Sequence, residues 1–87
     1  MKVFITTNTE SIEGQEKSFF LLGVYKTKED AIKGLNEQAD IDMDNYDEED
    51  RERYKRSDVS NGFILSDGYN NYEYYISERE IEEGSAV

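Results

Sequence analysis

Carboxylates are the side chains of this chain that offer the most chemistry, and they are concentrated in residues 37–50. This stretch reads EQADIDMDNYDEED and holds eight carboxylates with no lysine or arginine. The net charge of −11 is segregated: residues 1–35 carry five acids and five lysines, whereas residues 36–87 carry sixteen acids and five cations. Negative charge at this local density is typical of a site for a metal ion or for a cationic partner.

The inventory of side chains argues against an enzyme. The chain has no cysteine and no histidine, which excludes thiolate metal sites, disulfides and nucleophiles activated by histidine. Carboxylates, lysines, tyrosines and hydroxyls remain, and no motif organises them. We therefore expect a protein without enzymatic activity, without a cofactor and without a bound metal.

The aspartates at 40, 42 and 44 resemble the first three ligand positions of an EF-hand calcium loop. The sixth position is Asn45 instead of glycine, and the twelfth is Arg51, where a bidentate glutamate is required. A cation at the place of the strongest ligand disfavours a calcium loop. A divalent-cation-binding module remains an alternative function. Weak, nonspecific binding of divalent ions is expected more readily than a calcium loop.

The same acids can imitate the phosphates of nucleic acid. Alternate residues of an extended segment lie about 6.6 Å apart, a spacing of the order of neighbouring backbone phosphates. Carboxylates at this density fit the basic cleft of a DNA-binding protein, while a merely solvated acidic surface is the alternative. The predicted partner-binding acids are Asp40, Asp42, Asp44, Asp47, Glu48, Glu49 and Asp50, with Glu78, Glu80, Glu82 and Glu83 as a second set.

Three of the seven tyrosines crowd into one short segment, at Tyr72, Tyr74 and Tyr75. Tyrosine brings large area and a polar tip to interfaces, so these residues form a possible homodimer face. Alternatively, some of them pack under a helix, or the segment serves as an adaptor that binds another protein.

Four strands are expected to position these side chains, over residues 2–7, 18–27, 63–65 and 72–77. Residues 18–27 are apolar on both faces, which predicts a strand in the middle of the sheet, and Gly23 predicts a bulge or a close approach there. The turn residues of 57–62 and 67–71 separate the later strands.

Helices are expected between the second and third strands. Thr27 is a candidate N-cap, and Ile32, Leu35 and Ala39 form an apolar stripe. A short second helix is predicted in 47–56 from its acid-then-base pairs four residues apart, namely Asp47/Arg51, Glu49/Arg53 and Glu52/Arg56.

The predicted fold is α+β: a four-stranded, mostly antiparallel sheet in ββαββ order with one or two helices on one face. We expect one domain over residues 1–83, with an acidic segment at 37–56 and a flexible tail at 84–87. No window has the apolar length of a membrane span, and the apolar start is too short for a signal peptide. The expected location is therefore the cytoplasm, and acidic membranes and nucleic acids would repel the chain.

Three segments at the beginnings or ends of the predicted strands resemble a known type of protein. The opening MKVFI, the segment VYKTKEDA and the closing YYISEREIEE resemble small acidic host-takeover proteins of lytic Bacillus-type phages, in particular the DNA-mimic inhibitors of the nucleoid protein HU. The resemblance lies in the size, the acidity and the sequences at the strand ends. It does not assign a role to any individual residue. It implies a dimeric, non-enzymatic inhibitor in the cytoplasm of a bacterial host. Other phage inhibitors of this character act on a nuclease or on RNA polymerase. Inhibition of another such host protein that handles DNA or RNA is therefore an alternative function.

Overall fold

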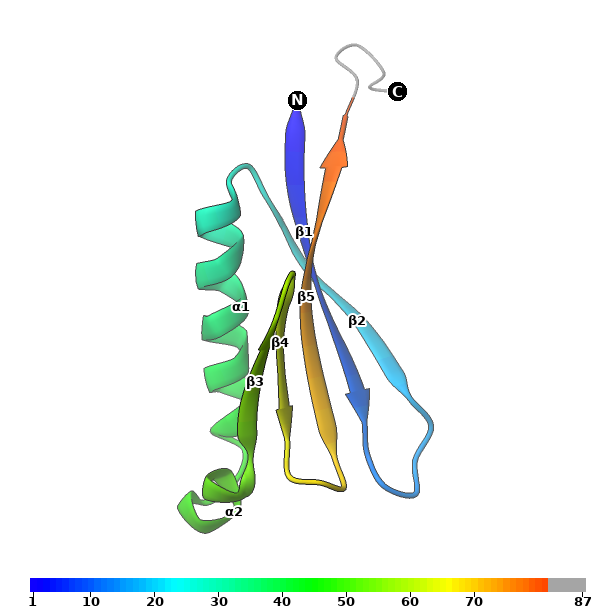
Figure 1. The fold of residues 1–87 in the computed structure, drawn as a ribbon, viewed down its shortest axis with the longest axis vertical. Helices are drawn as coiled ribbons and strands as arrows, with labels where there is room; N and C mark the ends of the chain where they lie inside the picture. Colours follow the sequence, from blue (N-terminus) through cyan, green and yellow to red (C-terminus); the bar gives the residue numbers. More distant parts are fainter. Residues whose placement is uncertain (82–87) are drawn as a thin grey trace.

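Within residues 1–81, five antiparallel strands and two helices make up the fold (Figure 1). The computed structural model describes residues 1–81, so the tail expected at 84–87 lies outside this range. The elements are β1 (Lys2–Ser11), β2 (Ser18–Tyr25), α1 (Lys28–Met43), α2 (Glu48–Arg53), β3 (Lys55–Val59), β4 (Gly62–Ser66) and β5 (Asn71–Glu80). The strand order is β2-β1-β5-β4-β3, and all neighbours are antiparallel. The α+β class is confirmed, with five strands in place of the expected four.

The strand that sequence reasoning missed is β3, which reads KRSDV and is exposed along its whole length. It forms an edge of the sheet and pairs with β4. Arg56 attaches it to the rest of the molecule: the guanidinium lies 3.9 Å from the Phe63 ring centre and donates a hydrogen bond to Asn36 of α1. Side-chain anchoring of this kind leaves no hydrophobic alternation in the sequence.

The placement of β2 in the middle of the sheet was wrong, because β2 is the opposite edge strand and pairs only with β1. Its Phe19, Leu21 and Val24 side chains are 68%, 66% and 58% exposed. The central strands are instead β1 and β5, which pair over ten residues. The predicted irregularity at Gly23 is confirmed, since the β1–β2 register shifts there and leaves one extra residue in β2.

One face of the sheet is covered by α1 (Figure 1). Thr27 is its N-cap, as expected, and accepts a hydrogen bond from the Asp30 backbone N–H. The buried helix residues are Ala31, Leu35 and Ala39, whereas Ile32 of the predicted stripe is 44% exposed. Neither α1 nor α2, the helices within residues 1–81, has the length and apolar character needed to cross a membrane.

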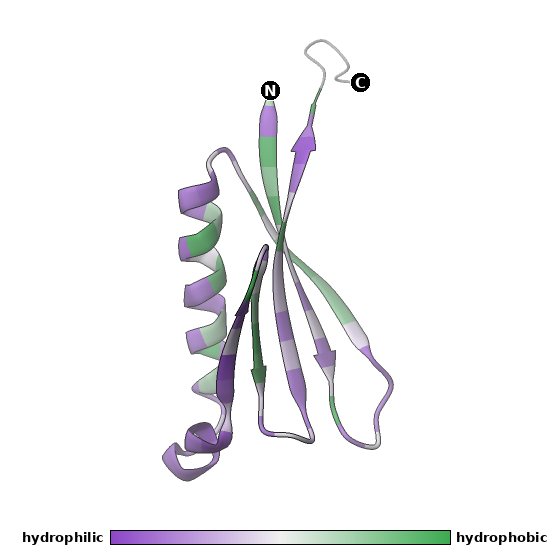
Figure 2. Cartoon of the chain, in the orientation of Figure 1, coloured by the Kyte–Doolittle hydropathy of each residue, from purple (hydrophilic) through white to green (hydrophobic). Residues whose placement is uncertain are grey.

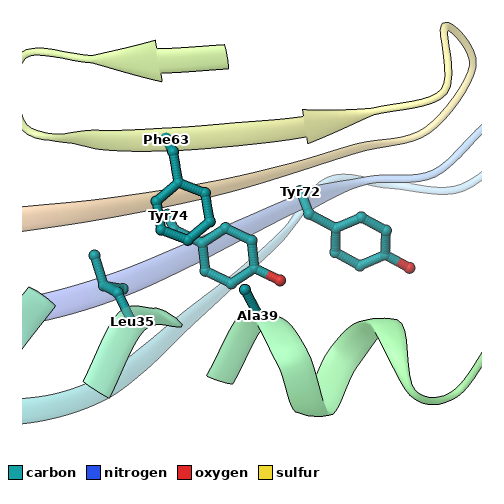
Figure 3. Packing of buried hydrophobic residues seen from close by; sticks show 5 residues of the cluster. All are labelled: Leu35, Ala39, Phe63, Tyr72 and Tyr74. Carbon is teal, nitrogen blue, oxygen red and sulfur yellow. The ribbon is translucent and has the colours of Figure 1, made fainter. Parts of the chain in front are cut away.

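The core is rich in aromatic rings (Figure 3). Leu35 and Ala39 of α1 meet Phe63 of β4 and Tyr72 and Tyr74 of β5. The Phe63 and Tyr74 rings stack with their centres 4.9 Å apart, and Tyr74 is fully buried. The packing between helix and sheet therefore depends on tyrosines, whose hydroxyls require polar partners inside the domain.

Of the two glycines within the strands of residues 1–81, Gly62 is the one at which an added side chain would clash with the backbone. A Cβ there would fall on the backbone carbonyl of Tyr74 and 3.0 Å from the Cα of Tyr75. We predict that Gly62→Ala lowers the free energy of unfolding by about 3 kcal/mol, at the upper end of the cost of overpacking, because backbone atoms must move. Ser57→Ala on exposed β3 should change it by less than about 0.5 kcal/mol. Urea denaturation of both variants checks this, and equal midpoints would contradict it.

Candidate functional site

One end of the molecule is strongly acidic. Residues 37–53, which we call the acidic end, comprise the C-terminal half of α1, the following turn and α2, and they carry nine carboxylates and two arginines. Figure 2 shows α2 as almost uniformly hydrophilic. The predicted short helix is confirmed over Glu48–Arg53. Its N-cap is Asp47, whose carboxylate accepts a hydrogen bond of 2.9 Å from the Asp50 backbone N–H.

Helical structure changes how the aspartates at 40, 42 and 44 are displayed. Asp40 and Asp42 lie inside α1, and Asp44 is its C-cap, so the expected extended spacing was wrong. Alternate residues of a helix point to different sides of its axis. The helix also rules out an EF-hand loop at these positions. Within residues 1–81, no group of three or more acidic side chains is arranged to hold a metal ion.

Asp42 points toward the sheet and serves the core. Its Oδ2 accepts a hydrogen bond of 2.7 Å from the Tyr74 hydroxyl, and its Oδ1 accepts one of 3.0 Å from the Gln38 side-chain amide. Burial, together with this carboxylate, raises the pKa of the Tyr74 phenol. Asp42 is therefore a structural residue that joins α1 to β5. Among the predicted partner-binding acids, it is the one whose carboxylate is hydrogen-bonded to a core residue.

Sequence reasoning did not single out Glu10 of β1, which lies on the same face of the sheet as Tyr72, its partner in β5. Burial, and after it the nearby Asp42 carboxylate, raises the pKa of Glu10.

Three tyrosines pack together beside this residue. The hydroxyls of Tyr46 and Tyr72 are hydrogen-bonded, and the Tyr54 ring centre lies 5.3 Å from that of Tyr46 and 5.7 Å from that of Tyr72. Burial raises the pKa of Tyr54 to about 12.

Two cations lie among the carboxylates of the acidic end. Arg51 forms an ion pair of 3.2 Å with Asp44, and Arg53 forms one of 3.7 Å with Asp50. The predicted pairs four residues apart are not formed in the described part of the chain, because Arg51 and Arg53 pair with these other acids and Arg56 belongs to β3. Within residues 1–81, six exposed acids of this end form no ion pair within 4 Å: Glu37, Asp40, Asp47, Glu48, Glu49 and Glu52.

The second predicted set of acids lies elsewhere. Glu78 and Glu80 are near the end of β5, beside the start of β1, whereas α2 lies at the other end of a molecule about 50 Å long (Figure 1). Glu78 pairs with Lys2 at 3.8 Å, and Glu80 pairs with the terminal amino group at 3.0 Å. Glu82 and Glu83 lie outside the described residues. The predicted partner-binding acids within residues 1–81 therefore form two separate groups, of which only the acidic end is dense.

The tyrosines of β5 divide between the two faces of the sheet. Tyr72 and Tyr74 face α1 and are 5% and 0% exposed, so the expectation that they form a dimer face was wrong. Their alternate positions place both of them in the core beneath the helix. Tyr75 lies on the opposite face, where its hydroxyl donates a hydrogen bond of 2.7 Å to Glu73.

The two roles of the α1 aspartates can be separated by mutation. We predict that Asp42→Ala lowers the free energy of unfolding by about 1–3 kcal/mol, because it leaves the buried Tyr74 hydroxyl without its acceptor. The control Asp40→Ala removes an exposed acid of the same helix and should cost less than about 0.5 kcal/mol. Chemical denaturation measures both values. A small loss for Asp42→Ala would show that the hydrogen bond contributes little.

The raised pKa of Glu10 predicts a specific pH dependence. Because folding disfavours the charged form, this carboxylate destabilises the protein above its folded-state pKa and has no effect below its ordinary value of 4.5. Glu10→Gln should therefore raise the melting temperature at pH 7, and the gain should vanish as the pH falls below that value. Glu13→Gln in the exposed loop corrects for the lowered net charge. Equal gains for the two variants would refute a special role of Glu10.

No family model matches this chain, and the same holds for curated proteins and for solved structures. No relative therefore assigns a role to any of its residues. The acidic end, the tyrosine core and the sheet face opposite α1 are the features from which its function has to be inferred.

Proposed function

We propose that the protein is a non-enzymatic inhibitor whose acidic end imitates nucleic acid and occupies the DNA-binding site of a basic host protein. The observation that carries the proposal is the concentration of nine carboxylates in residues 37–53 with only two arginines among them. Both arginines are engaged in ion pairs, with Asp44 and Asp50. The exposed acids that remain supply the negative field that attracts a cationic partner.

The positions of the other cations strengthen the argument. Of the five cations in residues 36–87, Arg56 lies over Phe63 and bonds Asp58 and Asn36. Lys55 and Arg79 lie, by strand register, on the face of the sheet away from α1. The fold thus keeps three of these cations from neutralising the acidic end. A general solubilising surface has no need of such segregation.

The structure narrows the set of acids proposed to contact the partner. Asp42 is used by the core, Asp47 caps α2, and Glu78 and Glu80 lie at the far end. The contact surface is therefore the outer side of α1 and α2, where the exposed acids are Glu37, Asp40, Glu48, Glu49 and Glu52. The nucleoid protein HU is the first partner to test, on the strength of the resemblance in the sequences at the strand ends.

A matched pair of triple variants tests this proposal. Glu48→Gln, Glu49→Gln and Glu52→Gln remove three charges from α2, whereas Glu13→Gln, Glu16→Gln and Glu29→Gln remove three from the neutral half of the chain. We expect the α2 variant to bind purified HU about tenfold more weakly, as three exposed pairs of about 0.5 kcal/mol each would give. The control variant should bind as tightly as the unaltered protein.

Calorimetry at increasing salt, with duplex DNA as competitor, completes the test. Binding of the unaltered protein should weaken steeply as salt rises, and DNA should displace it from HU. Affinity that is indifferent to salt, or equal losses in the two triple variants, would contradict the proposal. Binding to another nucleic-acid-binding protein with the same two signatures would preserve the mechanism and replace the target.

A further inference from the structure

The face of the sheet that α1 does not cover, which we call the open face, differs from the rest of this acidic protein. Strand register places three exposed apolar side chains of β2 on it, Phe19, Leu21 and Val24, together with Ile5 of β1 and Tyr75 of β5. Seven of its residues line a shallow hollow together with Asn61: Ile5, Thr7, Phe19, Leu21, Tyr75, Ser77 and Arg79. Within the described part of the chain, the face therefore exposes apolar side chains to water, mainly along β2, beside polar residues of β1 and β5.

Charge on the open face is the reverse of charge on the helical side. The strand residues that register places there include one acid, Glu73, and two cations, Lys55 and Arg79. Both carboxylate oxygens of Glu73 have partners: Oε1 accepts from the Tyr75 hydroxyl at 2.7 Å, and Oε2 lies 3.9 Å from the Lys17 ammonium. In a chain of net charge −11, this face carries no unpaired acid within residues 1–81.

We infer that the open face is the contact surface for a second copy of this chain. Two sheets packed open face to open face would bury their apolar side chains and would leave the two α1–α2 layers on the outside. Such an arrangement keeps the acidic ends of the two copies away from the interface, so their mutual repulsion does not oppose association. The contact is isologous, which closes the assembly at a dimer.

The dimensions of the face are those of a stable interface. Five strands about 4.8 Å apart, the longest of ten residues rising about 3.3 Å each, span roughly 20 by 30 Å. That is the scale of the about 800 Å² which each partner of a standard interface buries. The exposed Phe19, Leu21 and Val24 of the edge strand β2, with Ile5 and Tyr75 on the neighbouring strands, supply apolar area of the kind found in the core of such interfaces. The inference does not depend on the proposed function, since none of the open-face residues belongs to the acidic end.

A charge placed on the open face tests the inference against a matched control. Leu21→Lys introduces a lysine at a side chain that is 66% exposed, and Ile41→Lys does the same at a side chain of α1 that is 58% exposed. We expect sedimentation equilibrium to show a dimer for the unaltered protein and for Ile41→Lys. Leu21→Lys should weaken the dimer at least tenfold, because the two-fold axis introduces the charge twice. Circular dichroism should show that both variants fold.

Salt dependence separates this dimer from binding through the acidic end. Between about 0.1 M and 1 M salt the Debye length falls from about 10 Å to 3 Å, so the dimer should persist or tighten while a complex with a basic partner dissociates. Leu21→Lys should still bind HU if the proposed function is correct. A monomer at high salt and high concentration, growth beyond a dimer, or an unchanged dimer in Leu21→Lys would each overturn the inference.

Discussion

The hydrogen bond from the buried Tyr74 hydroxyl to Asp42 is the contact that relates the sheet to the helix carrying the acidic end. A tyrosine at this position supplies aromatic area for the core, and its hydroxyl must find an acceptor inside the domain. Asp42 provides that acceptor from the last turns of α1. One aspartate is thus turned inward, while its neighbour Asp40 remains on the outer side of the helix.

Two different surfaces follow from this arrangement. The helical layer presents carboxylates, and the sheet presents apolar side chains with a slight excess of cations on its other side. A small domain gains little stability from its core, and concentrated like charge lowers that stability further. Because the sheet lies between these two surfaces, the acidic one is available to a cationic partner and the apolar one to another apolar surface.

Local sequence signals predicted local structure well. The Thr27 cap, the short helix after Asp47, the irregularity at Gly23 and the α+β class all follow from propensity and periodicity, and all are present. The strand order was not predictable in this way. An apolar segment such as residues 18–25 has the same composition whether a helix, a second sheet or a partner molecule covers it, so its exposure at a sheet edge could not be read from its residues.

The acidic composition of the candidate site was predictable from the sequence, whereas the directions in which its side chains point were not. The density of acids in residues 37–50 is visible in the sequence, but which acid turns inward depends on the rotation of α1 over the sheet. Likewise, Arg56 appeared to be a helix partner of Glu52 and instead lies on Phe63, a residue of another strand. Contacts between elements distant in the chain decide such cases.

The ten-residue pairing of β1 with β5 joins the first strand of the described chain to its last. During synthesis, β1 and β2 leave the ribosome long before β5 does. Until β5 emerges, the edge of β1 that pairs with it has no partner. Contacts of such large sequence separation slow folding, because a long loop has to be closed before any of them forms. A nascent chain of this protein thus completes its sheet only after β5 has left the ribosome.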